Sequence, residues 1–330
     1  MRIRILGGGW YGCSIALGLI KDGHDVELHE IASRLFAGAS GGNPARLHMG
    51  FHYPRSRLTR AMCQEHHNEF MGAYGDLTRH IPVNIYAIAD KDSQIDFGTY
   101  LQVLRGEVEL VVIERPSEWG LCNVEGAVLT GERHIVVDQA RKFFEDKLDR
   151  VVRFRMQPGE VDDPAWDLTL DCTFCAFDSE DVDRYEPCIT MLLEGPVDRS
   201  VTIMDGPFPS LYVWNESKRY SSLTSASLTP FSKCCRTYAE ARAVLDALTA
   251  EDLVTRGERM LDQMAFYWPE VRERYLIADQ MLTIRAMPRS GADARLVDVV
   301  RVGERALRVR AGKIDAIFHA ERIVKEMISA

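Results

Sequence analysis

The segment from His48 to Arg57 holds the side chains that are best suited to acid–base chemistry. It contains His48, His52 and Tyr53, followed by Arg55 and Arg57. A histidine there could take a proton from an alcohol or an ammonium group before a hydride leaves, because its ordinary pKa lies near neutrality. The arginines could orient an anionic or polyhydroxylated substrate, or they could be solvated while one histidine only bridges a hydrogen bond. We take His48, His52 and Tyr53 as catalytic candidates.

The chain begins with a glycine-rich turn that suits a dinucleotide. Gly7, Gly9 and Gly12 form a Gly-x-Gly-x-x-Gly pattern after the mainly apolar run 3–6 and before an apolar helical stretch. The first glycine allows a tight strand-to-helix turn, the second lets the backbone approach a pyrophosphate, and the third lets the helix pack on the strand. The first N–H groups of the helix then face the phosphates. The predicted contacts are Gly7, Gly9, Trp10, Tyr11 and Gly12.

An acid at the end of the second predicted strand selects the type of dinucleotide. Residues 25–30 read as a strand that ends in Glu30, 23 positions beyond Gly7. A carboxylate at this place can accept hydrogen bonds from both ribose hydroxyls and would repel a 2′-phosphate. The sequence therefore predicts a dinucleotide with a free ribose diol and disfavours NADP.

The segment after Glu30 favours FAD over NAD. Residues 39–43 read Ala-Ser-Gly-Gly-Asn and offer several N–H groups to a second stretch of phosphate. A permanently bound FAD is enclosed by such a second loop, whereas NAD must bind and dissociate during turnover. Near the other end of the chain, a glycine turn at Gly312 enters a helix, whose positive dipole end would face the flavin N1/O2 edge. The further predicted FAD contacts are Ser40, Gly41, Gly42, Asn43, Arg46, Gly312, Lys313 and Ile314.

Two basic residues in the last fifty positions complete the catalytic candidates. Lys313 lies beside the predicted flavin turn, where a cation would stabilise an anionic reduced flavin and assist its reaction with oxygen. Arg285 could clamp a substrate carboxylate through two hydrogen bonds. The alternatives are a lysine at a helix start pointing into water and an arginine at a strand end on the surface.

These motifs together resemble the D-amino-acid oxidase and glycine oxidase superfamily of FAD-dependent oxidoreductases. The resemblance rests on the Gly7–Gly12 turn, Glu30, the loop 39–43 and the Gly312–Ile314 turn. It implies a glutathione-reductase-type Rossmann FAD-binding domain and two-electron oxidation of a C–N or C–O bond by hydride transfer to flavin N5. The chain departs from the superfamily at Arg285, where Arg-Ala-Met-Pro replaces the usual Arg-Pro followed by Asp-Gly.

The order of predicted elements indicates an α/β fold of two interleaved domains. Strands are expected at 2–6, 25–30, 151–156 and 166–172 in a parallel sheet, and short β-rich runs between 187 and 227 in an antiparallel cap sheet. Helices are expected at 10–22, 57–75, 138–148 behind an Asp138 cap, 237–248, 250–264 and 314–328, with a hairpin at 296–309. We predict that the FAD-binding domain comprises 1–80, 130–180 and 280–330, and the smaller substrate domain 81–129 and 181–279.

Composition excludes several function classes. The 330 residues carry a net charge of −9, which argues against broad binding to nucleic acid or to anionic membranes. We expect no signal peptide, because the first apolar run is short, and no apolar run reaches ~18 residues, so we expect a cytoplasmic protein that spans no membrane. The eight cysteines are scattered, as in a reducing compartment. Cys172 and Cys175 form one Cys-x-x-Cys without a second pair, so packed thiols and no metal are expected.

The favoured function is oxidation of a C–N bond in an amine, an amino acid or an amino-acid-like group. The group could be free or carried on a sugar, a nucleotide or a modified nucleic-acid base, and molecular oxygen or another acceptor would reoxidise the flavin. One alternative is a flavin-dependent dehydrogenase for a 2-hydroxy acid or sugar alcohol, in which the histidine-rich segment supplies the base. Another is a flavoprotein without net redox turnover, such as a sugar mutase. The oligomeric state stays open, and FAD is expected to bind noncovalently.

Overall fold

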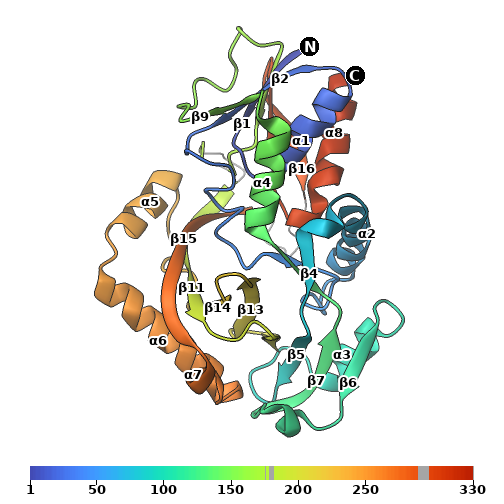
Figure 1. The fold of residues 1–330 in the computed structure, drawn as a ribbon, viewed down its shortest axis with the longest axis vertical. Coiled ribbons are helices and arrows are strands. Elements are labelled where there is room, and N and C mark those ends of the chain that lie inside the picture. The colour runs from blue at the N-terminus through green and yellow to red at the C-terminus, as the bar shows by residue number, and fades with distance from the viewer. Residues whose placement is uncertain (175, 178–181, 289–296, 330) are drawn as a thin grey trace.

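The computed structural model describes residues 1–174, 176–177, 182–288 and 297–329. Its frame consists of a six-stranded sheet, an eight-stranded sheet and a small three-stranded sheet. In Figure 1 the six-stranded sheet occupies the end that holds both chain termini, and the eight-stranded sheet occupies the other end.

The six-stranded sheet is mainly parallel. It has the order β16-β17-β10-β1-β2-β9, and only β16 and β17 pair antiparallel within it. Ile3, Ile5 and Leu6 of β1 are buried, as is typical of a strand covered on both faces. The strands are β1 (Arg2–Leu6), β2 (Asp25–Glu30), β9 (Val152–Phe154), β10 (Leu168–Asp171), β16 (Asp298–Gly303) and β17 (Ala306–Arg310).

Helices pack against this sheet through a large aromatic core. Trp10, at the start of its helix, is buried with its ring centroid 4.9 Å from that of Phe36 and 5.5 Å from those of Phe70 and Phe144. These contacts fix the first turn of the helix that follows the glycine motif. The helices here are α1 (Trp10–Lys21), α2 (Arg57–Tyr74), α4 (Val137–Leu148) and α8 (Ile317–Ser329), with the short 3-10 turns η1 (Gly75–Leu77) and η3 (Ile314–Ala316).

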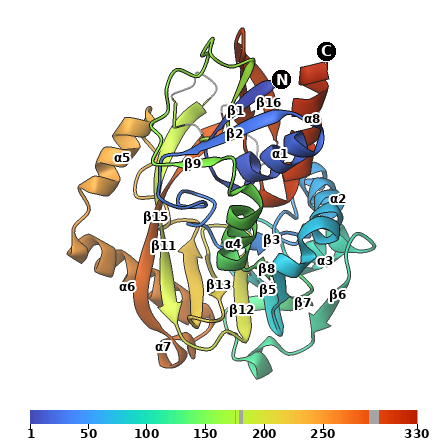
Figure 2. The ribbon, with the colours of Figure 1, turned by 45° about the horizontal axis from the view of Figure 1, so that its top comes forward.

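The eight-stranded sheet is mixed, with the order β15-β11-β14-β13-β12-β5-β7-β6. Its neighbours pair antiparallel except for β5 and β12, which run parallel. Figure 2 shows α5 and α6 along the β11 and β15 side of this sheet. The strands are β5 (Val83–Ala89), β6 (Leu110–Ile113), β7 (Val124–Thr130), β11 (Val182–Glu194), β12 (Arg199–Met204), β13 (Pro209–Asn215), β14 (Tyr220–Ser225) and β15 (Leu276–Pro288). The remaining helical elements are α3 (Phe97–Leu104), η2 (Pro116–Trp119), α5 (Tyr238–Asp246), α6 (Ala250–Tyr267) and α7 (Val271–Arg274).

A three-stranded sheet connects the two larger ones. It has the order β3-β8-β4, with β3 (Arg46–Leu47), β8 (Arg133–Ile135) and β4 (Thr78–His80). The strand β3 directly precedes the histidine-rich segment, and β8 directly follows the turn after β7. This small sheet therefore brings the histidine-rich segment next to one end of the eight-stranded sheet.

Most of the predicted elements are present, and several details were wrong. The strands near 151–156 and 166–172 return to the parallel sheet, and β16 and β17 form the expected hairpin. Asp138 lies in the first turn of α4 and is not its cap, because the helix already begins at Val137. The strand β15 was not expected, since its sequence mixes polar and apolar residues without a clear period of two. The expected division at 280 falls inside β15, which belongs to the eight-stranded sheet, and the domain boundaries stay a prediction.

We predict that Gly12→Ala destabilises the fold. A Cβ at Gly12 would lie 2.0 Å from the carbonyl oxygen of Gly7, and backbone cannot yield as a flexible side chain can. Overpacking of this kind costs about 1–3 kcal/mol or more, so thermal unfolding should shift to a clearly lower temperature. The matched control is Gly38→Ala, where an added Cβ meets nothing within 4 Å. Equal unfolding temperatures for Gly12→Ala and the unsubstituted protein would contradict the close packing.

Candidate active site

The glycine motif adopts a conformation that other residues would not tolerate. Gly7 has φ of +101°, in the left-handed region, and a Cβ there would lie 2.7 Å from the carbonyl oxygen of Cys172. A Cβ on Gly9 would lie 2.7 Å from Ser40 Oγ, which accepts a hydrogen bond of 3.0 Å from the N–H of Trp10. The start of α1 and the second glycine-rich loop are therefore in direct contact, as one cradle for a dinucleotide requires.

Glu30 lies at the end of β2, as the sequence predicts. Its Oε2 accepts a hydrogen bond of 2.7 Å from the N–H of Gly8, and its Oε1 accepts one of 2.8 Å from the N–H of Ala32. These bonds hold the carboxylate beside the glycine turn. Because each carboxylate oxygen has a second lone pair, Glu30 can also accept from ribose hydroxyls.

The second glycine-rich loop is compact and packs on the eight-stranded sheet. A Cβ on Gly41 would lie 2.2 Å from the carbonyl oxygen of Phe36, and a Cβ on Gly42 would lie 2.3 Å from Cγ2 of Thr283 in β15. Both glycines are thus needed for close approach. The loop therefore lies between the start of α1, which Ser40 contacts, and β15.

Asn43 closes this loop with its side chain. The amide nitrogen donates to the carbonyl oxygen of Ala39 over 2.6 Å, and Oδ1 accepts from the N–H of Ala45 over 2.7 Å. The carbonyl oxygen of Asn43 accepts from the indole N–H of Trp214 over 3.0 Å. The side chain of this predicted cofactor contact therefore holds the loop in shape.

The turn near the C-terminus is tied to the first glycine motif. The hydroxyl of Tyr11 donates to the carbonyl oxygen of Lys313 over 2.5 Å and accepts from the N–H of Gly312 over 3.2 Å. Burial raises the pKa of Tyr11 well above its ordinary value, so the hydroxyl stays a donor. Ile314 then begins η3 and leads into α8. Segments more than 300 positions apart thus meet where the sequence predicts the cofactor.

Four of the predicted catalytic side chains gather next to this turn, and we name them the His48 cluster: His48, His52, Tyr53 and Lys313. The ring centroid of His48 lies 5.7 Å from that of His52 and 5.4 Å from that of Tyr53. The Nζ atom of Lys313 lies 3.3 Å from the ring centroid of Tyr53, in a cation–π contact. The lysine thus points into the protein and not into water.

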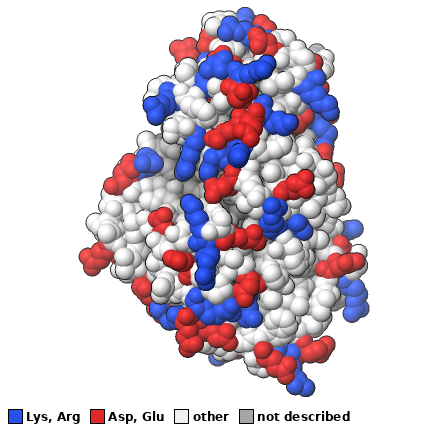
Figure 3. Space-filling view, in the orientation of Figure 1, with Lys and Arg blue, Asp and Glu red and all other residues white. Residues whose placement is uncertain are grey.

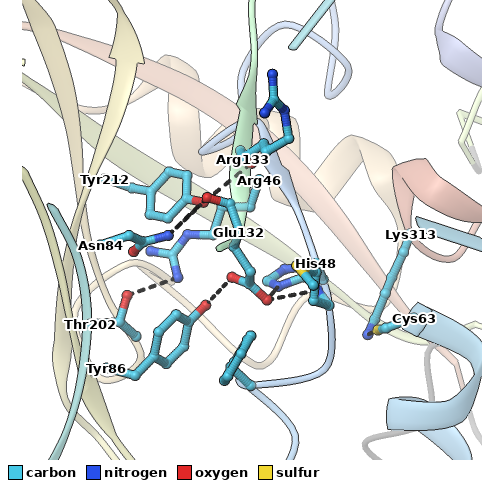
Figure 4. A network of polar contacts seen from close by, with 12 residues as sticks. Arg46, His48, Cys63, Asn84, Tyr86, Glu132, Arg133, Thr202, Tyr212 and Lys313 are labelled. Carbon is cyan, nitrogen blue, oxygen red and sulfur yellow. Dashed lines mark hydrogen bonds and ion pairs between the residues drawn. The ribbon is translucent and has the colours of Figure 1, made fainter. Parts of the chain in front are cut away.

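A buried carboxylate lies at the base of the cluster (Figure 4). Glu132, in the turn between β7 and β8, is fully buried. Its Oε2 accepts a bond of 2.5 Å from the hydroxyl of Tyr86, and its Oε1 accepts one of 2.8 Å from the N–H of Met49. The same Oε1 lies 3.6 Å from Nδ1 of His48.

The charge states of Glu132 and His48 make His48 suitable as a proton acceptor. Burial alone would raise the pKa of Glu132, but His48, the Tyr86 hydroxyl and the Met49 N–H stabilise the carboxylate and leave the pKa below its ordinary value. Burial lowers the pKa of His48, and Glu132 opposes part of that change. At neutral pH the arrangement is therefore a neutral imidazole beside an ionised carboxylate.

Arg46 points into the eight-stranded sheet. Its guanidinium donates to Oγ1 of Thr202 over 3.1 Å and to Oγ of Ser210, and lies 4.3 Å from the ring centroid of Tyr212. Figure 4 shows it on the side of Glu132 that faces Thr202 and Tyr212. The side chain thus fastens β3 to β12 and β13, and its predicted contact with FAD stays a prediction.

Arg285, the remaining catalytic candidate, forms an ion pair with Glu186. Its Nε lies 3.0 Å from Oε2 of the buried Glu186, and Nε of Arg184 lies 2.9 Å from Oε1. Burial would raise the pKa of Glu186, but the two guanidinium groups hold it below its ordinary value. Arg285 therefore links β15 to β11, and a substrate carboxylate would compete with Glu186 for it.

Sequence reasoning missed Glu132 and Cys63. Glu132 stands in Gly-Glu-Arg between two strands, which is typical of an exposed turn. Cys63 shares a helical spacing with Thr59, His66 and Phe70, all buried in α2. That spacing could have indicated that Cys63 lies on the buried face of α2, but not that its neighbour is Lys313.

The surface and the described side chains limit other kinds of site. Figure 3 shows Lys and Arg side chains in a line down the middle of one face, with acidic side chains among them. Among the described residues, no three His, Cys, Asp or Glu side chains are grouped as a metal site would require. Within the same residues no helix has the length and apolar character to cross a bilayer. Cys175 of the Cys-x-x-Cys pair lies outside the described residues.

Comparison with known proteins decides the family. The family described as FAD dependent oxidoreductase, DAO, matches residues 2–140. The chain is 32% identical to the FAD-dependent monooxygenase FPY4 of Fusarium mangiferae, over 98% of this chain and 90% of that protein. The chain belongs to the FAD-dependent oxidoreductases. It is also 29% identical to the FAD-dependent monooxygenase kojA of Aspergillus flavus, over 83% of this chain and 73% of that protein.

Solved structures confirm the fold of this FAD-dependent oxidoreductase. Glycine oxidase from Geobacillus kaustophilus superimposes with a TM-score of 0.72 at 14% identity, covering 99% of this chain and 94% of that one. L-alpha-glycerophosphate oxidase from Mycoplasma pneumoniae with FAD bound gives 0.75 at 12% identity, with the same coverage of both chains. The predicted α/β fold is therefore confirmed. The family match and the 32% identical relative confirm the predicted superfamily and the cofactor FAD.

We predict that Asp315 makes stability fall as pH rises. Burial raises the pKa of Asp315 to about 7, with Lys313 opposing part of the change. Between about pH 4 and about pH 7 the folded protein therefore keeps the Asp315 carboxyl protonated. The unfolded chain, in which an aspartate has its ordinary pKa of about 4, has released that proton. The free energy of unfolding therefore falls as pH rises toward and through the folded-state pKa, by an amount on the order of 3 kcal/mol from pH 5 to pH 8.

Thermal unfolding of Asp315→Asn at several pH values between 5 and 8 checks this assignment. The decrease in unfolding temperature from pH 5 to pH 8 should be smaller in Asp315→Asn than in the unsubstituted protein. Asp146→Asn, at an exposed position of α4, is the control and should keep the full pH dependence. An unchanged slope in Asp315→Asn would show that another group causes it.

Proposed function

We propose that this FAD-dependent oxidoreductase oxidises a C–N bond of an amine, an amino acid or an amino-acid-like group, free or carried on a larger molecule. The observation that supports this proposal most directly is the position of the His48 cluster, with Glu132 behind it. The cluster lies beside the Gly312–Ile314 turn, and Tyr11 of the first glycine motif is hydrogen-bonded to that turn. Bound FAD supplies the acceptor for the two electrons of such an oxidation.

His48 is the proton acceptor in this proposal. Its Nδ1 faces Glu132, so Nε2 is left for the substrate. The imidazole is neutral at neutral pH because burial lowers its pKa, and it can take a proton from a bound ammonium group. Glu132 then stabilises the imidazolium that forms and fixes the orientation of the ring, as an orienting carboxylate does in other acid–base pairs.

The proton-transfer chemistry of the cluster favours an amine over an alcohol. Glu132 is a fully buried negative charge that attracts a cationic substrate and offsets the repulsion from the Lys313 ammonium of the same cluster. An ammonium group is also far more acidic than an alcohol, so a neutral imidazole suffices as its base. Glycine oxidase and the iminodiacetate oxidase of Chelativorans sp. BNC1, which has a TM-score of 0.66, share this fold and lend further support.

Lys313 and Tyr53 have supporting roles. The ammonium of Lys313 is held over the Tyr53 ring at the start of the segment that leads into α8. A fixed cation there stabilises negative charge that develops on a neighbouring group during oxidation. The role of Arg285 as a carboxylate clamp stays a prediction, because Glu186 is its partner here.

Monooxygenation is the second candidate. The relative matched over 98% of this chain is described as an FAD-dependent monooxygenase. A monooxygenase reduces one atom of dioxygen to water and needs an external reductant for it, whereas an amine oxidase or dehydrogenase takes both electrons from the substrate. The need for a reductant therefore separates the two candidates.

The test is anaerobic mixing of the purified holoenzyme with a panel of amines, amino acids, hydroxy acids and sugar nucleotides. Amine oxidation predicts that an amine or amino acid alone bleaches the visible flavin absorption. Bleaching by a hydroxy acid alone would contradict it in favour of C–O oxidation. Bleaching only when a reduced nicotinamide is added, with oxygen incorporated into the product in air, would favour the monooxygenase.

We predict that Glu132→Gln slows flavin reduction and moves its pH profile. General acid–base assistance contributes about 10²–10⁴-fold, and loss of an orienting carboxylate should remove about 10–100-fold of it. Because Glu132 raises the pKa of His48, its removal should shift the acid limb of kcat/KM to lower pH. Rapid-mixing measurements from pH 5 to 9 would show both effects.

Glu216→Gln is the matched control for this substitution. Oε1 of Glu216 lies 3.3 Å from Nε2 of His134, in another histidine–glutamate pair of the molecule. The control should leave the acid limb where it is. A Glu132→Gln enzyme that is slower but has an unmoved acid limb would assign Glu132 a merely structural role.

A further inference from the structure

Lys313 and Cys63 are in unusually close contact. Nζ of Lys313 lies 2.8 Å from Sγ of Cys63. That separation is as short as an ordinary N–H···O hydrogen bond of about 2.9 Å, although sulfur is larger than oxygen. Figure 4 shows the two side chains approaching end to end, from α2 and from the turn before η3.

The pair lies in a confined space. Cys63 is 1% exposed, and it lines with Lys313 a cavity of about 10 Å³ whose other walls are Thr59, Met62, His66, Asp315 and Ala316. A cavity of that size holds about one water-sized molecule. Dioxygen is only slightly larger than water, whereas a bulky thiol such as glutathione is far too large for this space.

We propose that Lys313 and Cys63 form a covalent cross-link in which a single oxygen atom bridges Nζ and Sγ. The oxidant is dioxygen. The Lys313 ammonium first releases one proton to solvent. The resulting amine loses one hydrogen and the thiol loses its hydrogen, one oxygen atom enters the new N–O–S bridge, and the other oxygen atom leaves as water together with these two hydrogens. Lysine ammonium, cysteine thiol and one dioxygen thus give the cross-link, one water and one proton, with all atoms and four electrons accounted for.

The surroundings disfavour ordinary disulfide exchange at Cys63. Burial raises the pKa of the Cys63 thiol to about 12, and Lys313 offsets only part of the change. A thiol that stays protonated and buried is a poor partner for disulfide exchange, which needs an accessible thiolate. Oxidation of the sulfur also proceeds through the thiolate, and the Lys313 ammonium 2.8 Å away is the group that stabilises it.

The cross-link would change the charge of the His48 cluster. A bridged nitrogen is bonded to oxygen and is a much weaker base than a lysine amine, so the cation over the Tyr53 ring would disappear. The link would also join α2 to the segment before α8 covalently. The inference rests on the Lys313–Cys63 contact and its cavity and does not depend on the substrate class proposed above.

Peptide mapping of the holoenzyme tests the proposal. One sample is purified in air, and another under nitrogen with dithiothreitol; both are alkylated, digested with trypsin and analysed by mass spectrometry. In the air sample, peptide 61–79 should be joined to peptide 311–322, because trypsin cannot cleave after a bridged Lys313. The joined mass should equal the sum of the two peptides plus one oxygen atom minus two hydrogen atoms, and dithiothreitol should release both.

Three substitutions sharpen the result. Cys63→Ser and Lys313→Arg should abolish the joined peptide, the second while keeping a cation at position 313. Cys235→Ser, at another buried cysteine, should leave it in place. Separate peptides in the air sample would overturn the proposal. So would added oxygen on Cys63 with normal cleavage after Lys313, or a joined mass that lacks the bridging oxygen.

Discussion

The buried carboxylate of Glu132 is the interaction on which the site depends. A charge that is withdrawn from water is tolerated only when hydrogen bonds and opposite charge surround it. Here the donors come from Met49 and Tyr86, with His48 beside them. The need to satisfy one carboxylate therefore fixes the histidine-rich segment, a strand of the eight-stranded sheet and the turn after β7 in one arrangement.

The proposed cofactor side of the site is fixed by backbone geometry. The left-handed conformation of Gly7 and the contact of Gly9 with Ser40 shape the start of α1, and the Tyr11 hydroxyl joins that helix to the turn at Lys313. Lys313 then reaches Tyr53 and so meets the side that Glu132 organises. The two sides thus converge although their residues are spread over the whole chain.

The sequence could predict the features that depend on local geometry or on residue type. The glycine turn and Glu30 follow from what a strand, a tight turn and a helix require, and the histidine-rich segment stands out by its chemistry. Glu132 could not be predicted, because its burial results from contacts with strands far away in the sequence. The same holds for the pairing of Arg285 with Glu186 and for the long strand β15, whose partner β11 lies about a hundred positions earlier.

The most direct test of the central claim, that Glu132 organises a cluster at the flavin, is the visible absorption spectrum of bound FAD. The spectrum of Glu132→Gln is compared with that of the unsubstituted protein at equal FAD content. The account predicts that the flavin absorption bands change in wavelength or in the sharpness of their vibrational structure. The reason is that the charge beside His48 and Lys313 has changed. Superimposable spectra would contradict it and would place the His48 cluster away from the cofactor.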